Sequence, residues 1–459
     1  MNPIEPPAFR DRLPAAGIMI MLTAASLLAA CGARDGATGG GASADGGSCE
    51  LGDQQAWVER NMNDYYLFYD RVPTVRRADY PSSDALLDAL RVPPDTFSFI
   101  TDAARSTALF EEGKLVGYGW HLDRRDDGAL ILTLIDKGSP LDLAGARRGE
   151  LVRTINGVDE RTLTGAQAGE ALGTGEQLRT VRLGLEAADG TRREIEVTRA
   201  RYTVLGVQQL DVVEQGALRV GYLNFLSFIE PARAELDRAF ATLAEERVDE
   251  LVLDLRFNGG GRVDVAKELA SRIGGAGVQG RDFTRFRFND KAPGVPIDGV
   301  PLPFVPLVDS LDLARIYVLT GPGTCSASEM VINGLAPFVE VITIGQPTCG
   351  KPFGFRGLER CDEAMFAVEF EFVNDAGVGG YVNGLAPDCP VTPDDVNPLG
   401  TAAESLFGAA LRHIDTATCP AMLAGGAALR DARLRASDAP GGAPRRNPVD
   451  PFGNDLPPR

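Results

Sequence analysis

The pattern of hydrophobic and polar positions changes its period along the chain and predicts segments of different structure. Residues 49–112 place their apolar side chains at helical spacings, so they predict a small helical domain. Residues 113–200 hold short apolar runs that are typical of strands, and they predict a β-rich domain. Residues 201–424 alternate apolar runs with amphipathic stretches, which predicts an α/β domain with a largely parallel sheet. We therefore expect a multidomain α+β protein.

Two segments towards the ends of the chain lack such a pattern. Residues 31–48 consist mainly of glycine, alanine and serine, and they predict a flexible tether. Residues 425–459 are rich in proline and glycine, and they predict a disordered tail. Neither segment has enough apolar side chains to form a core of its own.

Residues 1–30 have the features of a bacterial export signal. Arg10 and Arg12 precede an uncharged stretch over residues 13–30, which runs into the letters LLAAC. This ending resembles a lipobox, which implies cleavage before Cys31 and acyl chains that anchor a periplasm-facing lipoprotein. No aspartate follows the cysteine, and this favours the outer membrane of a Gram-negative cell. The alternative is an uncleaved transmembrane anchor, because eighteen uncharged residues almost suffice to span a bilayer.

Charge and cysteine content narrow the choice of partners and compartment. The net charge of −18 disfavours nucleic acid or an anionic lipid surface as the main partner. Without Cys31 six cysteines remain, an even number that fits disulfides in an oxidising compartment. Six cysteines allow fifteen pairings, of which Cys349 with Cys361 is one short-loop option. The sequence has no CxxC pair and two histidines, so no metal or organic cofactor is expected.

A run of small residues, GTCSASEM, places Ser326 just before a predicted helix. A nucleophilic serine needs a base, and His121 and His413 both lie outside any motif. A Ser-His-Asp triad is therefore not favoured, and both histidines are interpreted as surface or packing residues. The alternative role of Ser326 is a helix cap, which Ser328 or Thr324 could provide as well.

Lysine is the other side chain that could act as the base. The chain has 46 lysine and arginine residues, of which five are lysines. Arginine keeps its proton too tightly to act as a base. Lys351 stands in TCGKPFGF, a turn after a predicted buried strand and 25 residues after Ser326. One helix and one strand can return the chain to the same end of the sheet, where the two side chains would meet. Burial there would lower the pKa of the lysine, so that it could accept a proton near neutral pH.

Three motifs, LDLRFNGGG, CSASE and IGQPTCGKP, together resemble those of the C-terminal processing, or tail-specific, serine peptidases. The resemblance implies a catalytic domain of the crotonase/Clp-like ββα kind, with Ser326 as the nucleophile and Lys351 as the general base. It also implies an oxyanion hole of backbone amides, one from Gly260 or Gly261 and one from Ala327.

Phe355 is a departure from this family. Many members carry a glutamine four residues after the lysine, which orients the lysine side chain, and this chain has phenylalanine there. Gln346 and Glu329 are nearby candidates to hold the ammonium group. Cys325 and Cys349 each lie beside a motif residue and could form disulfides that stiffen the site.

The stretch KLVGYGWHL, followed by SPLDLAGARRGELVRTINGV, resembles a PDZ domain. In that family a glycine-containing loop presents backbone amides to the C-terminal carboxylate of a peptide, which then adds as a strand to the sheet. The resemblance assigns this loop to Gly117, Tyr118, Gly119 and Trp120, and it implies C-terminal tails or unfolded protein segments as partners. The alternative is a PDZ-shaped spacer without a ligand.

The favoured interpretation is thus a lipid-anchored serine endopeptidase with a Ser/Lys dyad. An alternative of another class is a non-catalytic PDZ lipoprotein scaffold with a decayed site, and Phe355 is the residue that supports it. A third interpretation, an α/β hydrolase that acts on small esters, lacks the GxSxG motif and a histidine in context.

Overall fold

The structure of the chain, a computed structural model, describes residues 48–125, 127–291 and 299–419. The predicted export signal, Cys31, almost all of the predicted tether and the predicted tail lie outside these residues. Among the described residues, no helix is both long and apolar enough to cross a bilayer.

Residues 49–112 form mainly helices, as predicted. The elements are α1 (Leu51–Asp64), η1 (Tyr69–Arg71), η2 (Arg77–Asp79), α2 (Ser83–Leu90), β1 (Phe99–Asp102) and α3 (Ala103–Phe110), where η marks a 3-10 helix. The helices α1 and α2 pack on each other, and their buried side chains Trp57, Met62, Leu86 and Leu87 belong to one apolar cluster. Burial of this shared face stabilises helices that are too short to be stable alone.

Strand β1 is the part of this segment that the helical prediction missed. It pairs antiparallel with β19 (Glu363–Phe366), which pairs in turn with β18 (Leu358–Arg360). The residues of β1, FITD, include aromatic and β-branched side chains that suit a strand. Its partner comes from a distant part of the sequence, and local periodicity cannot reveal such a pairing.

Residues 113–200 form a sheet with the strand order β3-β4-β5-β7-β8, and β6 pairs with β5. The elements are β2 (Lys114–Gly117), β3 (Trp120–Arg124), β4 (Leu130–Ile135), α4 (Pro140–Leu143), β5 (Leu151–Ile155), β6 (Val158–Asp159), η3 (Glu160–Thr162), α5 (Gly165–Leu172), β7 (Thr180–Glu186), β8 (Arg192–Thr198) and β9 (Ala200–Thr203), which pairs with β2. Along β7 every second side chain, Val181, Leu183 and Leu185, is buried in a separate apolar cluster. The prediction of a β-rich segment is confirmed.

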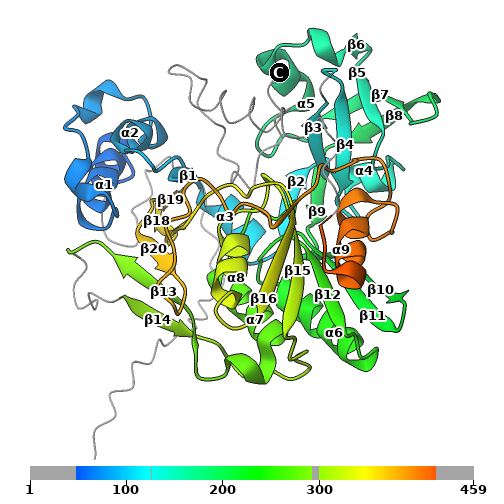
Figure 1. Cartoon of the computed structure of the whole chain (residues 1–459). Coiled ribbons are helices and arrows are strands. Elements are labelled where there is room, and N and C mark those ends of the chain that lie inside the picture. The colour runs from blue at the N-terminus through cyan, green and yellow to red at the C-terminus, as the bar shows by residue number, and fades with distance from the viewer. Residues whose placement is uncertain (1–47, 126, 292–298, 420–459) are drawn as a thin grey trace, which may run out of the picture. The chain divides into compact units, whose positions relative to one another are not determined.

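The sheet that follows has the order β10-β11-β12-β15-β16-β21, and all of its pairs except β10 with β11 are parallel. Its strands and helices are β10 (Val207–Gln215), β11 (Leu218–Phe225), α6 (Ala232–Glu245), β12 (Glu250–Asp254), α7 (Val263–Gly274), η4 (Gly275–Val278), β15 (Arg315–Thr320), α8 (Ala327–Leu335), β16 (Glu340–Gly345), β21 (Cys389–Pro390) and α9 (Ser405–Thr416). The helices α6, α8 and α9 contact the strands, and α7 packs against α6 and α8 (Figure 1). The strands β12 and β15 are buried almost throughout, as is typical of parallel strands that helices cover. The predicted, largely parallel sheet is confirmed.

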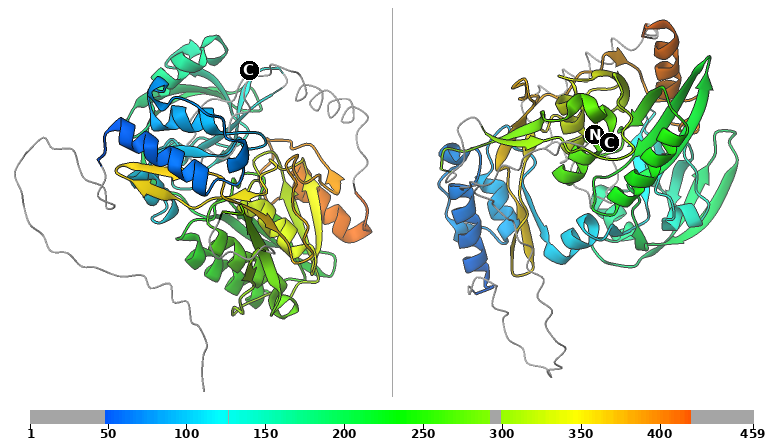
Figure 2. Two further views of the ribbon diagram at one scale, coloured as in Figure 1. Left: turned by 90° about the vertical axis from the view of Figure 1, so that its left-hand side faces the viewer. Right: turned by 90° about the horizontal axis from the view of Figure 1, so that it is seen from below.

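An antiparallel sheet with the order β14-β13-β20-β17 was not predicted. Its strands are β13 (Asp282–Phe288), β14 (Val300–Pro303), β17 (Phe353–Gly354) and β20 (Phe370–Val373). Phe353, Met365 and Val368, which lie on or beside these strands and β19, join the apolar cluster of α1 and α2. The helices near the N-terminus therefore pack against strands from the second half of the chain (Figures 1 and 2).

The described residues hold three disulfides: Cys49–Cys361, Cys325–Cys349 and Cys389–Cys419. The short-loop option of Cys349 with Cys361 is therefore wrong. Cys361 turns instead towards the start of α1, where it pairs with a cysteine that is 312 residues away in the sequence. Disulfides of this kind persist outside the cytoplasm, so they indicate an extracytoplasmic location.

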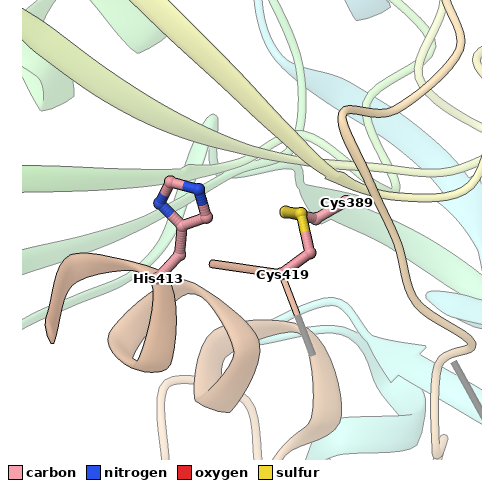
Figure 3. A group of neighbouring side chains, drawn as sticks. All are labelled: Cys389, His413 and Cys419. Atoms are coloured by element: carbon pink, nitrogen blue, oxygen red, sulfur yellow. A yellow bond between two sulfur atoms is a disulfide. The ribbon is translucent and has the colours of Figure 1, made fainter. Parts of the chain in front are cut away.

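The pair Cys389–Cys419 lies beside His413, as Figure 3 shows. The ligand atoms of these three residues lie within 4.8 Å of one another, as a metal site would require. The disulfide uses both sulfur atoms, however, and a metal ion binds the thiolate. In the oxidised protein, the imidazole of His413 is therefore the one ligand that this group can offer a metal ion.

Candidate active site

Ser326 lies at the turn between β15 and α8 and is the residue directly before the helix. Its backbone has φ 55° and ψ −112°, a conformation that is costly for any residue except glycine and is found at functional turns. The hydroxyl of Thr324 donates to Leu255 O at 2.9 Å, and that of Ser328 donates to Asn258 O at 2.9 Å. Both side chains are buried, whereas Ser326 is partly exposed and lines a cavity.

Lys351 has a fully buried side chain that lines the same cavity. Its Nζ lies 3.8 Å from the ring centroid of Phe355 and 5.5 Å from that of Phe97. Burial lowers the pKa of Lys351 to about 7, and the negative charges of Asp95 and Glu329 act in the opposite direction. Near neutral pH a large fraction of this lysine is therefore free to accept a proton.

Glu329, on the first turn of α8, joins the segments of Ser326 and Lys351. One oxygen of its buried carboxylate accepts the amides of Ser326 and Lys351, both at 2.9 Å. The other oxygen accepts the amide of Gly350 at 2.8 Å and the hydroxyl of Thr348 at 2.5 Å. Burial raises the pKa of Glu329, although these four hydrogen bonds oppose the shift. The carboxylate that we considered as a partner of the ammonium group thus holds the backbone of the site instead.

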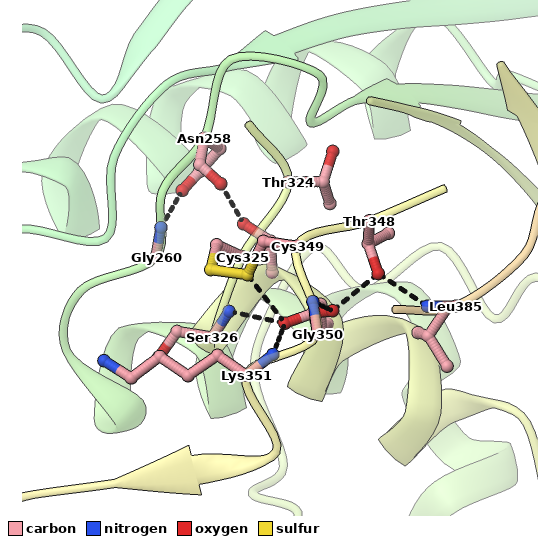
Figure 4. The surroundings of a disulfide bond; sticks show 12 residues. Asn258, Gly260, Thr324, Cys325, Ser326, Thr348, Cys349, Gly350, Lys351 and Leu385 are labelled. Carbon is pink, nitrogen blue, oxygen red and sulfur yellow. Dashed lines mark hydrogen bonds between the residues drawn. A yellow bond between two sulfur atoms is a disulfide. The ribbon is translucent and has the colours of Figure 1, made fainter. Parts of the chain in front are cut away.

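The disulfide Cys325–Cys349 makes a second connection between the same two segments. Cys325 precedes Ser326, Cys349 lies two residues before Lys351, and their Cα atoms are 5.2 Å apart. Figure 4 shows the bridge beside the hydrogen bonds that converge on this turn. The two segments are therefore linked by covalent and hydrogen bonds.

A glycine turn after β12 lies against the Ser326 turn. Gly260 and Gly261 have φ of 106° and 134°, and a Cβ at Gly260 would lie 2.9 Å from Ser326 Cβ. No other residue could bring the backbone so close. The amide of Gly260 donates to Asn258 Oδ1 at 2.8 Å, so this N–H already has an acceptor. Of the two glycines considered for an oxyanion hole, Gly261 is therefore the better candidate, together with Ala327 at the start of α8.

The cavity has a volume of about 1510 Å³ and extends from Ser326 and Lys351 towards β3, where Gly119 and Trp120 line it. Gly117 ends β2 and lies away from the lining, as does Tyr118. The Tyr118 side chain is fully buried, and its hydroxyl donates to the carbonyls of residues 172 and 179. Two of the four residues predicted for the carboxylate loop thus lie on the cavity wall.

The histidines occupy different places. His121 lines the cavity, and its Nε2 lies 2.9 Å from Asp136 Oδ1. Its ring also packs at 5.8 Å from that of Phe257, next to the glycine turn. His413 lies against Tyr317, with 5.6 Å between ring centroids. His121 is paired with Asp136 and His413 is not among the residues that line the cavity, whereas Lys351 lines it and has a lowered pKa, so Lys351 is the better candidate base.

Some residues of the site were not identified from the sequence. Asn258 and Thr348 lie inside the motifs LDLRFNGGG and IGQPTCGKP, so their positions in the motifs were an available signal. Asp95 and Phe97 lie far from both motifs and follow a helix with an ordinary amphipathic pattern. Folding of the N-terminal segment brings the Phe97 ring to within 5.5 Å of Lys351 Nζ, and the Asp95 carboxylate accepts the amide of Phe97.

Comparisons with known proteins indicate the family to which the chain is related. Residues 219–391 match Peptidase family S41, and residues 53–99 match the Peptidase S41 N-terminal domain. The chain is 28% identical over 359 residues to the C-terminal processing peptidase, chloroplastic, of Tetradesmus obliquus. The match covers 74% of this chain and 73% of that relative. The chain is also 27% identical over 366 residues to a carboxyl-terminal-processing protease of Picosynechococcus sp.. This match covers 77% of this chain and 83% of that relative.

A solved structure described as an S41 protease of Bacteroides fragilis has the same multidomain α+β fold. Its TM-score is 0.65 at 25% identity, and the match covers 79% of this chain and 97% of that one. Sequence and fold therefore lead to the same family. The chain belongs to peptidase family S41 and is a serine peptidase of the C-terminal processing type.

Proposed function

We propose that the protein is an extracytoplasmic endopeptidase that cleaves protein or peptide chains through Ser326 and Lys351. The observation that carries the proposal is that a fully buried lysine and a strained serine line the same cavity. Glu329 supports it, because its carboxylate accepts the amides of both residues.

In the proposed reaction, neutral Lys351 takes the hydroxyl proton of Ser326 while Oγ attacks the carbonyl carbon of the substrate. The oxygen of the tetrahedral intermediate accepts hydrogen bonds from the amides of Gly261 and Ala327. The lysine ammonium then gives its proton to the leaving amine, and an acyl-enzyme remains on Ser326. Water, deprotonated by Lys351, releases the acid and restores the serine.

The β-rich segment is proposed to be a PDZ-like domain that recognises the C-terminal tail of the substrate. Gly119 and Trp120 line the cavity of Ser326, which supports this role. Strand β3 ends the order of its sheet, so a peptide strand could add to its edge. We also propose the crotonase/Clp-like ββα fold for the catalytic part and a lipid anchor at Cys31, which lies outside the described residues.

The alternative of a scaffold with a decayed site rests on Phe355. Its ring face lies against the ammonium of Lys351, a contact worth about 2 kcal/mol when water is excluded. A charged hydrogen bond contributes about 1.5–3 kcal/mol. The ring can therefore replace the glutamine of the family as a partner of the lysine, which favours the peptidase.

Degradation of an unfolded protein by the full chain tests the proposal. We expect Ser326→Ala and Lys351→Met each to lower kcat/KM by about 1000-fold or more, because each removes one half of the dyad. The matched control is Lys267→Met on α7, which removes a lysine outside the cavity and should keep the activity of the parent. Equal activity of all four proteins would contradict the dyad.

A further inference from the structure

Asn258 is a fully buried polar residue at the start of the glycine turn. Its side-chain Oδ1 accepts the amide of Gly260 at 2.8 Å, and its Nδ2 donates to Phe225 O, at the end of β11, at 3.0 Å (Figure 4). A buried side-chain amide is costly unless both its donor and its acceptor are used. Both are used here, so the side chain of Asn258 ties the glycine turn to the parallel sheet.

The backbone of Asn258 contacts the turn of Ser326. Its carbonyl accepts the amide of Cys325 at 3.1 Å and the hydroxyl of Ser328 at 2.9 Å. These two residues lie on either side of Ser326 in the sequence. One residue therefore holds the glycine turn with its side chain and the turn of the proposed nucleophile with its carbonyl.

The same two turns carry the amides that are candidates for the oxyanion hole. A Cβ at Gly260 would lie 3.1 Å from Ala327 N, so the glycine turn closely approaches the start of α8. Phe228 N donates to Gly260 O at 3.1 Å, and Arg262 N donates to Phe228 O at 2.7 Å. Gly261 lies between these bonds, and its amide has no acceptor among the described residues. The amides of Gly261 and Ala327 thus belong to two backbone segments that Asn258 joins.

We infer that Asn258 is a positioning residue for the oxyanion hole: it fixes the amide of Gly261 relative to that of Ala327. This inference rests on the proposed cleavage at Ser326. Backbone donors stabilise the developing oxyanion most when they are held in place before the reaction. Asparagine suits this position because its side chain offers both an acceptor and a donor, whereas an ionised aspartate has no donor and leucine has neither.

The direct test is the variant Asn258→Ala in the full chain. We expect kcat on a peptide substrate to fall about 100-fold while KM stays within about twofold, because the oxyanion forms only in the transition state. A peptide aldehyde, whose carbonyl carbon adds the oxygen of Ser326, mimics this state. Its affinity should fall by a similar factor, whereas the same peptide with an alcohol in place of the aldehyde should bind as it does to the parent.

The matched control is Asn374→Ala. Asn374 is also a buried asparagine: its Oδ1 accepts the amide of Ala376 at 3.1 Å, and its Nδ2 donates to Asn333 O at 3.0 Å. It is not among the residues that line the cavity, so its loss should leave kcat at the value of the parent. An unchanged kcat in Asn258→Ala would overturn the inference, and so would an equal fall of kcat in both variants.

A second variant keeps the inference testable if Asn258→Ala does not fold. Asn258→Ser retains a neutral but weaker acceptor for the amide of Gly260 and loses the donor to Phe225. It must then lower kcat by about tenfold without a change in KM, because the glycine turn is held less firmly. A kcat equal to that of the parent would overturn the inference.

Amide hydrogen exchange of the same proteins separates this inference from the proposed function. Exchange in residues 258–262 should be at least about tenfold faster in Asn258→Ala than in the parent, and unchanged in Asn374→Ala. If the parent shows no activity that depends on Ser326 and Lys351, the proposed function fails, while exchange still decides whether Asn258 holds the glycine turn. Unchanged exchange in Asn258→Ala would show that it does not.

Discussion

At the scale of single residues, the site combines groups that would be costly anywhere else in the fold. Ser326 has a positive φ, Glu329 is a buried carboxylate and Lys351 is a buried amine. Each cost is offset locally, by the hydrogen bond and the adjacent disulfide that hold the Ser326 backbone, by four donors on Glu329 and by ring faces around Lys351. Costs of this kind persist where they serve a function.

The lowered pKa of Lys351 predicts how stability depends on pH. Below about 7 both the folded and the unfolded chain hold the proton, so the full cost of burying the charge is present. Between about 7 and the ordinary value of 10.5, the unfolded chain binds one more proton than the folded chain. The free energy of unfolding should therefore rise with pH in this window by up to about 1.4 kcal/mol per pH unit. Denaturant unfolding of the parent and of Lys351→Met, from pH 6.5 upwards, checks this, and equal slopes would contradict it.

At the scale of elements, the two candidate catalytic residues line the same cavity because β15 and β16 are parallel neighbours. Thr320 and Gly345, the last residues of these strands, pair with each other. The turn of Ser326 follows β15, and the loop of Lys351 follows β16. Parallel strands end at the same edge of a sheet, so the helix α8 and the strand β16 bring the chain back to its starting edge.

The disulfide Cys325–Cys349 should matter for both stability and catalysis. Replacing both cysteines by alanine should cost about 3 kcal/mol of unfolding free energy, because the loop that the bridge closes spans 24 residues. It should also lower kcat/KM by about tenfold, since small displacements of catalytic groups are costly.

The matched control for this variant is the same double replacement of Cys389 and Cys419. That bridge spans 30 residues, so its loss should cost a similar free energy while the activity of the folded protein stays unchanged. Equal kcat/KM in parent and Cys325→Ala/Cys349→Ala would show that the first bridge does not position the site.

At the scale of the whole molecule, the cavity is built from parts that lie far apart in the sequence. Phe99 and Phe110 come from the N-terminal segment, Trp120 comes from β3, and Phe366 comes from β19. Loops that follow strands of the parallel sheet contribute Ser326 and Lys351. A chain that enters along β3 would therefore reach Ser326 within one continuous cavity. This arrangement supports recognition of a tail at one end and cleavage at the other.

Recognition of the tail carboxylate can be tested with one peptide in two forms. We expect kcat/KM to be at least about tenfold higher for the free C-terminus than for the amidated one, because backbone amides near Gly119 would bind the carboxylate. Gly119→Ala should remove this preference, since a Cβ there would lie 2.1 Å from Ser139 Cβ.

Gly157→Ala is the matched control for this loop. Gly157 has a φ of 80°, close to the 78° of Gly119, and a Cβ there would meet nothing within 4 Å. The preference of the parent for the free C-terminus should persist in this variant. Equal rates of the parent on both peptides would argue against tail recognition.

The sequence alone indicated the main elements of the fold and the most important pair of residues. The spacing of apolar residues was enough to predict α1, α2, the β-rich segment and the parallel sheet, because such spacing depends on residues that are close together in the sequence. Ser326 and Lys351 were identified because each lies in a motif of a known family, at a spacing that one helix and one strand explain. Both residues line the same cavity.

The tertiary structure alone decided which distant groups meet. The pairing of β1 with β19, the disulfide Cys49–Cys361 and the approach of Phe97 to Lys351 all join segments that are far apart in the chain. Local patterns report which face of an element is buried, but not which other element covers it. The charge and orientation of Lys351 depend on those covering groups, so they follow from the folded structure.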